Sequence, residues 1–197
     1  MNRVAVNPEL ITWARERAGL EMLDLMGRFP KLPEWESGEI HPTLRQLEGF
    51  ARAVHAPIGY LFLPEPPAEP LPVPDFRTVA ERGVTRPTPN LLDTLYLCQQ
   101  RQDWFRNYAR MHGLEPLGFV GSAQLENDPI EIADSIRAEL GVSVAKRQQL
   151  PNWTEALRQL VSRAEEAGVL VMASSIVGSN SHRKLDVEEF RGFALVD

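Results

Sequence analysis

The stretch WESGEIHPTLRQLEGFARAV, residues 35–54, contains the signals that end one helix and begin the next. Gly38 is a typical helix terminator, because glycine adopts the left-handed conformation at little cost. Thr43 is a typical N-cap, and the apolar residues after it recur at helical spacing. These residues are Leu44, Leu47, Phe50, Ala51 and Val54. The stretch therefore predicts a short helix around Trp35, followed by a longer helix that buries one face.

Three further short helices are predicted around this pair, within residues 1–63. Asn7 can cap the first helix, which Gly19 ends. A second helix covers residues 21–28, and the last covers residues 57–62. The positions predicted to be buried in the first two are Leu10, Ile11, Ala14, Ala18, Met22, Leu25 and Met26. Together these segments predict an N-terminal five-helix bundle.

A proline-rich stretch, residues 64–74, separates this segment from the rest of the chain. Six of its eleven residues are proline, and proline neither continues a helix nor donates a hydrogen bond in a central strand. We therefore expect a Pro-rich linker that is extended and semi-rigid.

Beyond the linker, the pattern predicts a helical middle region and then terminal strands. The predicted helices are residues 90–112, 128–141 and 154–168, the predicted strands are residues 169–172 and 192–196, and a polar loop is expected at residues 178–184. The side chains expected to face inward are Leu91, Leu95, Cys98, Trp104 or Phe105, Tyr108, Ile132, Ala133, Ile136, Leu140, Ala156, Leu157, Leu160, Val161 and Ala164. Helices followed by strands predict a mainly α chain with a small α+β C-terminal part.

Composition narrows the class of protein. The formal net charge is -6, and residues 1–63 are close to neutral, with seven basic and eight acidic side chains. The single cysteine, Cys98, excludes an internal disulfide and suits a reducing compartment. The first twenty residues are interrupted by charges, unlike a signal peptide, and the apolar stretch at residues 168–178 is too short to span a bilayer. We therefore expect a cytoplasmic protein with no membrane partner.

Two elements near Trp35 resemble the C-terminal half of Xre/Cro-type helix-turn-helix domains. They are Trp35-Glu36-Ser37-Gly38, which in that family ends the recognition helix, and Pro42-Thr43-Leu44, which starts the following helix. The resemblance covers about residues 7–63. Glu36 is placed to hold backbone or a nearby basic group. The spacing from Leu25 to Trp35 is shorter than in the family, and the missing part is the turn and the start of the recognition helix.

This departure limits how the module could read DNA. The recognition helix normally enters the major groove, and a shortened one presents fewer side chains to the bases. We expect Arg28, Lys31 and Arg45 to be the DNA-binding residues, through contacts to phosphates, which position a protein without specifying sequence. The alternative is that the bundle serves as a protein-interaction or dimerisation module.

No complete catalytic or metal-binding motif occurs in the sequence. The four histidines, His41, His55, His112 and His182, do not share the i, i+4 spacing of a zinc helix. Cys98 has no second cysteine with which to build a thiolate zinc site. We therefore expect no catalytic, cofactor-binding or metal-binding residue in this chain.

The C-terminal part resembles the front end of ImmA/IrrE-type metallopeptidase domains, which often follow an Xre-type module. The resemblance is carried by residues 166–172, EAGVLVM, and residues 185–197, LDVEEFRGFALVD, with PDFRT at residues 74–78 and RQDW at residues 101–104. In that family a later helix carries His-Glu-x-x-His, which holds zinc. The resemblance implies that such a helix, and the zinc, would belong to a longer parent.

These expectations divide the chain into four parts. They are an Xre-like helix-turn-helix module (1–63), a Pro-rich linker (64–74), a helical connecting region (75–121) and an incomplete ImmA/IrrE-like α+β domain (122–197). The function expected is a DNA-binding transcriptional regulator of this architecture, without catalysis, with double-stranded DNA and either a protein partner or a homodimer as partners. The alternatives are the N-terminal portion of a zinc metallopeptidase regulator, and an antitoxin-like protein-interaction module.

Overall fold

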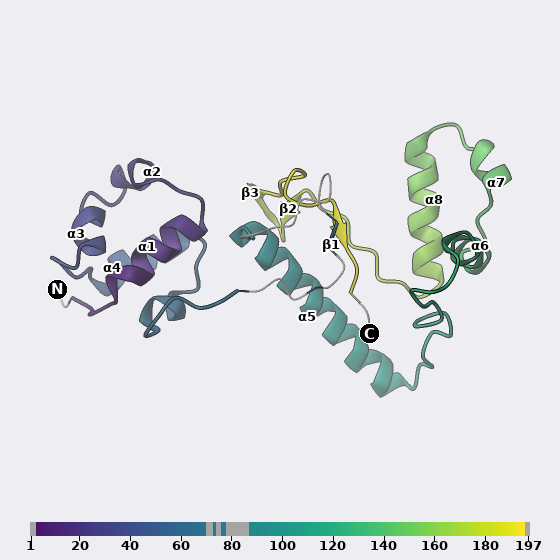
Figure 1. Ribbon diagram of the computed structural model, residues 1–197, viewed down its shortest axis with the longest axis horizontal. Helices are drawn as coiled ribbons and strands as arrows, with labels where there is room; N and C mark the ends of the chain where they lie inside the picture. Colours follow the sequence, from purple (N-terminus) through teal and green to yellow (C-terminus); the bar gives the residue numbers. More distant parts are fainter. Residues whose placement is uncertain (1–2, 70–72, 74–75, 78–86, 196–197) are drawn as a thin grey trace. The chain divides into compact units, whose positions relative to one another are not determined.

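The protein is mainly helical, with two small pairs of antiparallel strands (Figure 1). The computed structural model describes residues 3–69, 73, 76–77 and 87–195. The chain forms two compact units, of which the first contains Met1–Tyr96 and Ile176–Ala194, and the second Leu97–Ser175 and Leu195–Asp197. The mainly α fold with a small C-terminal β part confirms the predicted fold class.

The N-terminal segment folds into the predicted succession of short helices. They are α1 (Pro8–Arg17), α2 (Met22–Met26), α3 (Leu32–Glu36), α4 (Leu44–Ala53) and a 3₁₀ helix, η1 (Ile58–Phe62). The Asn7 side chain accepts a hydrogen bond from the backbone N–H of Glu9 at 3.1 Å. Thr43 caps α4 in a reciprocal pair with Gln46. Local cap signals therefore position both long helices of this segment.

Aromatic rings form the centre of the N-terminal core. Trp35 is 2 % exposed, and its ring centroid lies 6.4 Å from that of Phe50 and 6.0 Å from that of Phe29. The Trp35 and Phe50 rings meet edge to face at 88°, the arrangement that aromatic quadrupoles favour. The other buried apolar residues of this core are Val6, Leu10, Ile11, Ala14, Leu25, Leu32, Leu47, Ala51, Val54, Ala56 and Leu61.

Two positions predicted to be buried in this segment are exposed instead. Met26 is the last residue of α2, and its side chain is exposed, whereas that of Leu25 before it is buried. Leu44 is the first residue of α4 and lies at the edge of the helix, where its side chain remains exposed.

The strands differ from the prediction. Residues 169–172, predicted as a strand, have no regular secondary structure. The predicted polar loop instead forms a hairpin of β2 (Ile176–Val177) and β3 (Asn180–Lys184). Gly178 opens its two-residue turn with a φ of 56°, a conformation that glycine adopts freely. Turn chemistry, rather than apolar content, therefore decides where the hairpin forms.

The second strand pair joins distant parts of the chain. β1 (Phe76–Arg77) pairs antiparallel with β4 (Gly192–Phe193). The predicted strand at residues 192–196 is therefore confined to its first two residues within the described range.

The predicted helices of the remaining chain are present, with one addition. They are α5 (Pro89–His112), α6 (Pro129–Glu139) and α8 (Trp153–Glu166), and the sequence did not predict α7 (Val144–Gln148). Asp128, Ser143 and Asn152 cap α6, α7 and α8 with their side chains. The short α7 was missed because five residues give too little apolar periodicity to detect.

Several side chains predicted to be inward in these helices are exposed. Trp104 stacks on Tyr108 with 5.7 Å between ring centroids, yet it remains 67 % exposed. Ile136, Leu157 and Leu160 are also exposed. Neither α6 nor α8 has a buried residue. Helical periodicity shows where the apolar side chains of a helix gather, but it cannot tell whether another element covers them.

Candidate nucleic-acid interface

The three predicted DNA-contacting cations lie at or near the ends of α2, α3 and α4. Arg28 lies in the α2–α3 connection, Lys31 directly precedes α3, and Arg45 is the second residue of α4. All three are exposed, and none forms an ion pair with another residue in the described part of the chain. The Arg28 guanidinium lies 5.3 Å from the centroid of the Phe29 ring. Because no carboxylate among the described residues pairs with them, these three side chains are available to bind an external anion.

The helix between these cations offers little for reading bases. α3 has five residues, of which Leu32 and Trp35 are buried in the core, and Glu36 is held by Arg15. The remaining side chains, Pro33 and Glu34, are partly buried, and neither provides the donors with which Arg, Lys, Asn or Gln read base edges. The geometry therefore suits contacts to phosphates rather than direct readout of sequence.

Glu36 pairs with a basic side chain. The sequence led us to expect either a basic group or the backbone as its partner. Arg15 Nε donates to Glu36 Oε1 at 2.7 Å, and Arg15 Nη2 donates to Glu36 Oε2 at 3.0 Å. The side chains are only 12 % and 11 % exposed. The hydrogen bonds that Arg15 donates to the Glu36 carboxylate raise the pKa of Arg15 above its ordinary value. This bidentate pair fastens α3 to α1 and so holds the α2–α3 connection in place.

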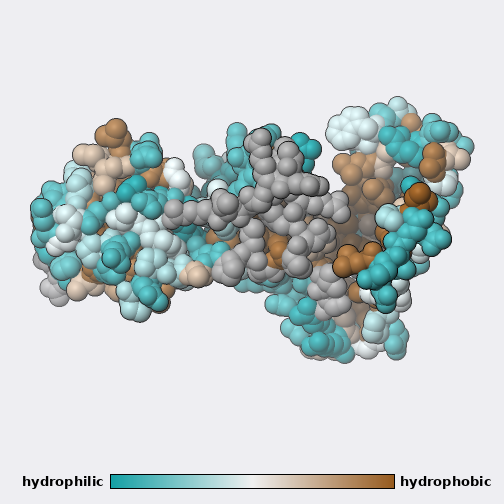
Figure 2. All heavy atoms as spheres, viewed as in Figure 1, coloured by the Kyte–Doolittle hydropathy of each residue, from teal (hydrophilic) through white to brown (hydrophobic). Residues whose placement is uncertain are grey.

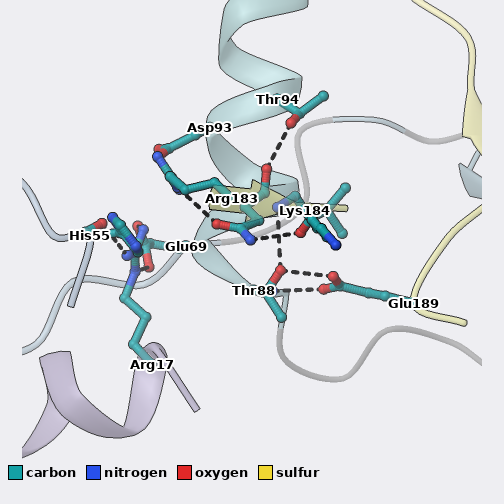
Figure 3. Close-up of polar contacts among 11 residues, drawn as sticks. Arg17, His55, Glu69, Thr88, Asp93, Thr94, Arg183, Lys184 and Glu189 are labelled. Atoms are coloured by element: carbon teal, nitrogen blue, oxygen red, sulfur yellow. Dashed lines mark hydrogen bonds and ion pairs between the residues drawn. The ribbon is translucent and has the colours of Figure 1, made fainter. Parts of the chain in front are cut away.

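A second ion pair, which the sequence did not predict, attaches the proline-rich segment to the helices (Figure 3). Arg17 Nη2 donates to Glu69 Oε1 at 2.8 Å, Arg17 Nε donates to Glu69 Oε2, and Arg17 Nη1 donates to the backbone oxygen of His55 at 3.0 Å. His55 follows α4 with a φ of 51°. Partial burial, then the charge of Arg183, lowers the pKa of His55, which favours its neutral form.

A third polar cluster fastens the start of α5 to the C-terminal hairpin, which lies beside it (Figures 1 and 3). The Glu189 carboxylate accepts from the backbone N–H and the hydroxyl of Thr88, each at 2.7 Å. Arg183 donates to Asn90 Oδ1 at 2.9 Å and lies 2.7 Å from Asp93 Oδ2. These contacts link residues about a hundred positions apart and complete the fold of the first unit.

The second unit contains an apolar groove with a basic rim. The groove has a volume of about 400 Å³ and lies among α6, α7 and α8 (Figure 2). Its apolar lining includes Val144, Leu150, Trp153, Leu157 and Leu160, and its charged lining is Arg137, Lys146 and Arg147. None of the described residues that line it is acidic, so its charge complements an anionic ligand.

In the part of the chain that the structure describes, no three His, Cys, Asp or Glu side chains come together to hold a metal ion. Burial raises the pKa of the Cys98 thiol, which disfavours the nucleophilic thiolate. Of the described helices, none combines the length and apolar character needed to cross a membrane.

Comparison of the chain with protein-family models, curated proteins and solved structures gives no match. Function is therefore argued from the residues themselves.

Proposed function

We propose that this chain is a DNA-binding regulator whose N-terminal helices contact the phosphate backbone through Arg28, Lys31 and Arg45. The observation that carries the proposal is three exposed cations without ion-pair partners among the described residues. In the sequence they flank the short helix α3, whose Leu32 and Trp35 are buried. Such an interface neutralises phosphates and releases their counterions. Sequence preference then comes from DNA shape or from a second copy of the module.

Salt dependence measures these contacts directly. Three neutralised phosphates give a slope of about -2.7 in a plot of log K against log salt concentration, or about 40-fold weaker binding between about 50 and 200 mM salt. The single variants Arg28→Ala, Lys31→Ala and Arg45→Ala should each make the slope shallower by about 0.9. Fluorescence anisotropy with a labelled duplex from around the chain's own gene provides the measurement.

Arg158→Ala is the matched control. Arg158 lies on α8 with an exposed side chain paired to Glu155 at 2.7 Å, so its loss changes net charge equally without touching the proposed interface. If Arg158→Ala makes the slope of log K against log salt concentration shallower by the same amount as the interface variants, only the overall charge of the chain matters. Absence of duplex binding at low salt would refute the proposal.

The groove of the second unit favours a second candidate function, a protein-interaction module without DNA binding. The groove presents the exposed apolar side chains of Trp153, Leu157 and Val144, as do the grooves of other proteins that receive amphipathic helices. Its basic rim favours a partner with acidic side chains. If the chain is such a protein-interaction module, the charge reversals Arg28→Glu and Lys31→Glu would leave its oligomeric state unchanged.

A pair of synthetic helical peptides tests this candidate. A peptide with leucines on one face and glutamates on the other should shift the emission of Trp153 to shorter wavelength, because burial removes the indole from water. The Trp153→Phe variant assigns the signal. The same peptide with lysine in place of glutamate should bind at least about tenfold more weakly. Equal affinity for both peptides would contradict the proposed selection by charge.

A further inference from the structure

The proline-rich segment that follows η1 is attached to α1 at two points. The first is at the N-terminal end of α1, where Asn7 Nδ2 donates to the backbone oxygen of Pro64 at 3.1 Å. The second is at the C-terminal end, where Arg17, the last residue of α1, holds Glu69 through both carboxylate oxygens. The segment thus meets both ends of one helix.

The lengths of the two segments agree. The ten residues of α1 rise by about 1.5 Å each, or about 15 Å in all. At the polyproline rise of about 3.1 Å per residue, the five steps from Pro64 to Glu69 could advance about 16 Å. The chain bends at residues 63–65 and has no regular secondary structure at residues 66–69, so its advance along α1 is at most about this length. Prolines at positions 64, 66 and 67 restrict the free chain to extended conformations, so less entropy is lost on attachment.

The Arg17–Glu69 pair is built as a specific attachment rather than an incidental surface contact. The side chains are 3 % and 11 % exposed, whereas an exposed ion pair contributes little. The Arg17 guanidinium also lies 5.6 Å from the centroid of the Trp13 ring, which itself packs 6.0 Å from Tyr60 of η1. Among the described residues, Glu69 is the only carboxylate that pairs with Arg17, so Arg17 would lose this partner if Glu69 moved away.

We propose that residues 64–69 form a strap that closes along α1, with Arg17 and Glu69 as its latch. While the latch is closed, the chain beyond residue 69 leaves the N-terminal helices from a fixed point at the C-terminal end of α1. When it opens, residues 64–69 are released from α1 and become a tether. The strap is thus a conformational device that sets how firmly the later residues are coupled to the N-terminal helices, whether or not these helices bind DNA.

The test is a distance measurement between spin labels in the full chain. The labels are attached at Glu9→Cys on α1 and Ala68→Cys on the strap, both exposed positions, in a Cys98→Ser background. The closed strap should give one narrow distance distribution. Glu69→Gln should broaden it at least twofold, because a neutral amide cannot replace the bidentate carboxylate. Glu65→Gln, an exposed position on the same strap, should leave it narrow.

A second variant separates opening of the strap from loss of the fold. Arg17→Gln combined with Glu69→Gln removes both charges, so no buried guanidinium is left unpaired. Its distribution should also broaden while circular dichroism keeps the helical signal. A distribution that is broad without any substitution, or that stays narrow in both the Glu69→Gln and the double variant, would overturn the proposal.

Discussion

Replacing Trp35 with alanine is expected to unfold the N-terminal helices while the second unit stays folded. Trp35 is 2 % exposed and packs against Phe29 and Phe50. Truncation of a buried tryptophan costs about 3–5 kcal/mol, which is comparable to the whole stability of a small helical module. Hydrogen exchange measured by mass spectrometry should show α4 amides losing protection and α8 amides keeping theirs.

Two matched variants define the cause of this loss. Leu23→Ala removes an exposed apolar side chain of α2, and we expect a change within about 0.5 kcal/mol. Trp35→Phe keeps an aromatic ring and removes an indole N–H that is buried without a hydrogen-bond partner in the described part, so part of the lost packing is offset. Protected α4 amides in Trp35→Ala would show that the aromatic cluster does not organise this core.

The N-terminal helices were predictable because their signals are local. Asn7 and Thr43 cap α1 and α4 as expected, and Gly38 has the left-handed φ of 78° that its position after α3 requires. Caps and glycine stops act through residues at most four positions away, so a single sequence contains them in full. The hairpin was mispredicted because Asn180–Lys184 is polar, so its composition indicates a loop. Its contacts to α5, from Arg183 to Asn90 and Asp93, join residues about ninety positions apart, which no local pattern reveals.

Of the two buried ion pairs of the N-terminal helices, the sequence indicated one in part and missed the other. A basic partner for Glu36 was one of the expected outcomes, because Glu36 follows the buried Trp35 on a short helix. The Arg17–Glu69 pair was not expected, since Glu69 lies within a stretch whose composition indicates a free linker. The two residues are 52 positions apart, and no periodicity connects a helix end to a proline-rich segment. The sequence also did not predict that Trp104 and Leu157 are exposed, because periodicity identifies the apolar face of a helix but not whether another element packs against it.

Replacing Glu36 with alanine is expected to destabilise the N-terminal helices by about 2–4 kcal/mol, because it leaves a buried guanidinium without its carboxylate. In the intact protein, Arg15 makes two hydrogen bonds to Glu36 and one to the backbone oxygen of Leu20 at 3.2 Å. Only the last would remain. Denaturant unfolding, followed by exchange of α1 and α4 amides, measures the loss for this module separately from the second unit.

The apolar pair Arg15→Met with Glu36→Leu tests whether the charges or the packing of these two side chains stabilise the module. Both charges are then removed together, so no unpaired ion is buried, and we expect stability within about 1 kcal/mol of the unsubstituted chain. Glu48→Ala is the control, since Glu48 pairs with Arg52 at 3.8 Å on the exposed side of α4, where a pair contributes less than about 1 kcal/mol. If the double variant is as unstable as Glu36→Ala, the ion pair itself stabilises the attachment of α3 to α1. If instead the double variant is stable but binds duplex DNA more weakly, the pair acts by fixing the α2–α3 connection that carries Arg28 and Lys31.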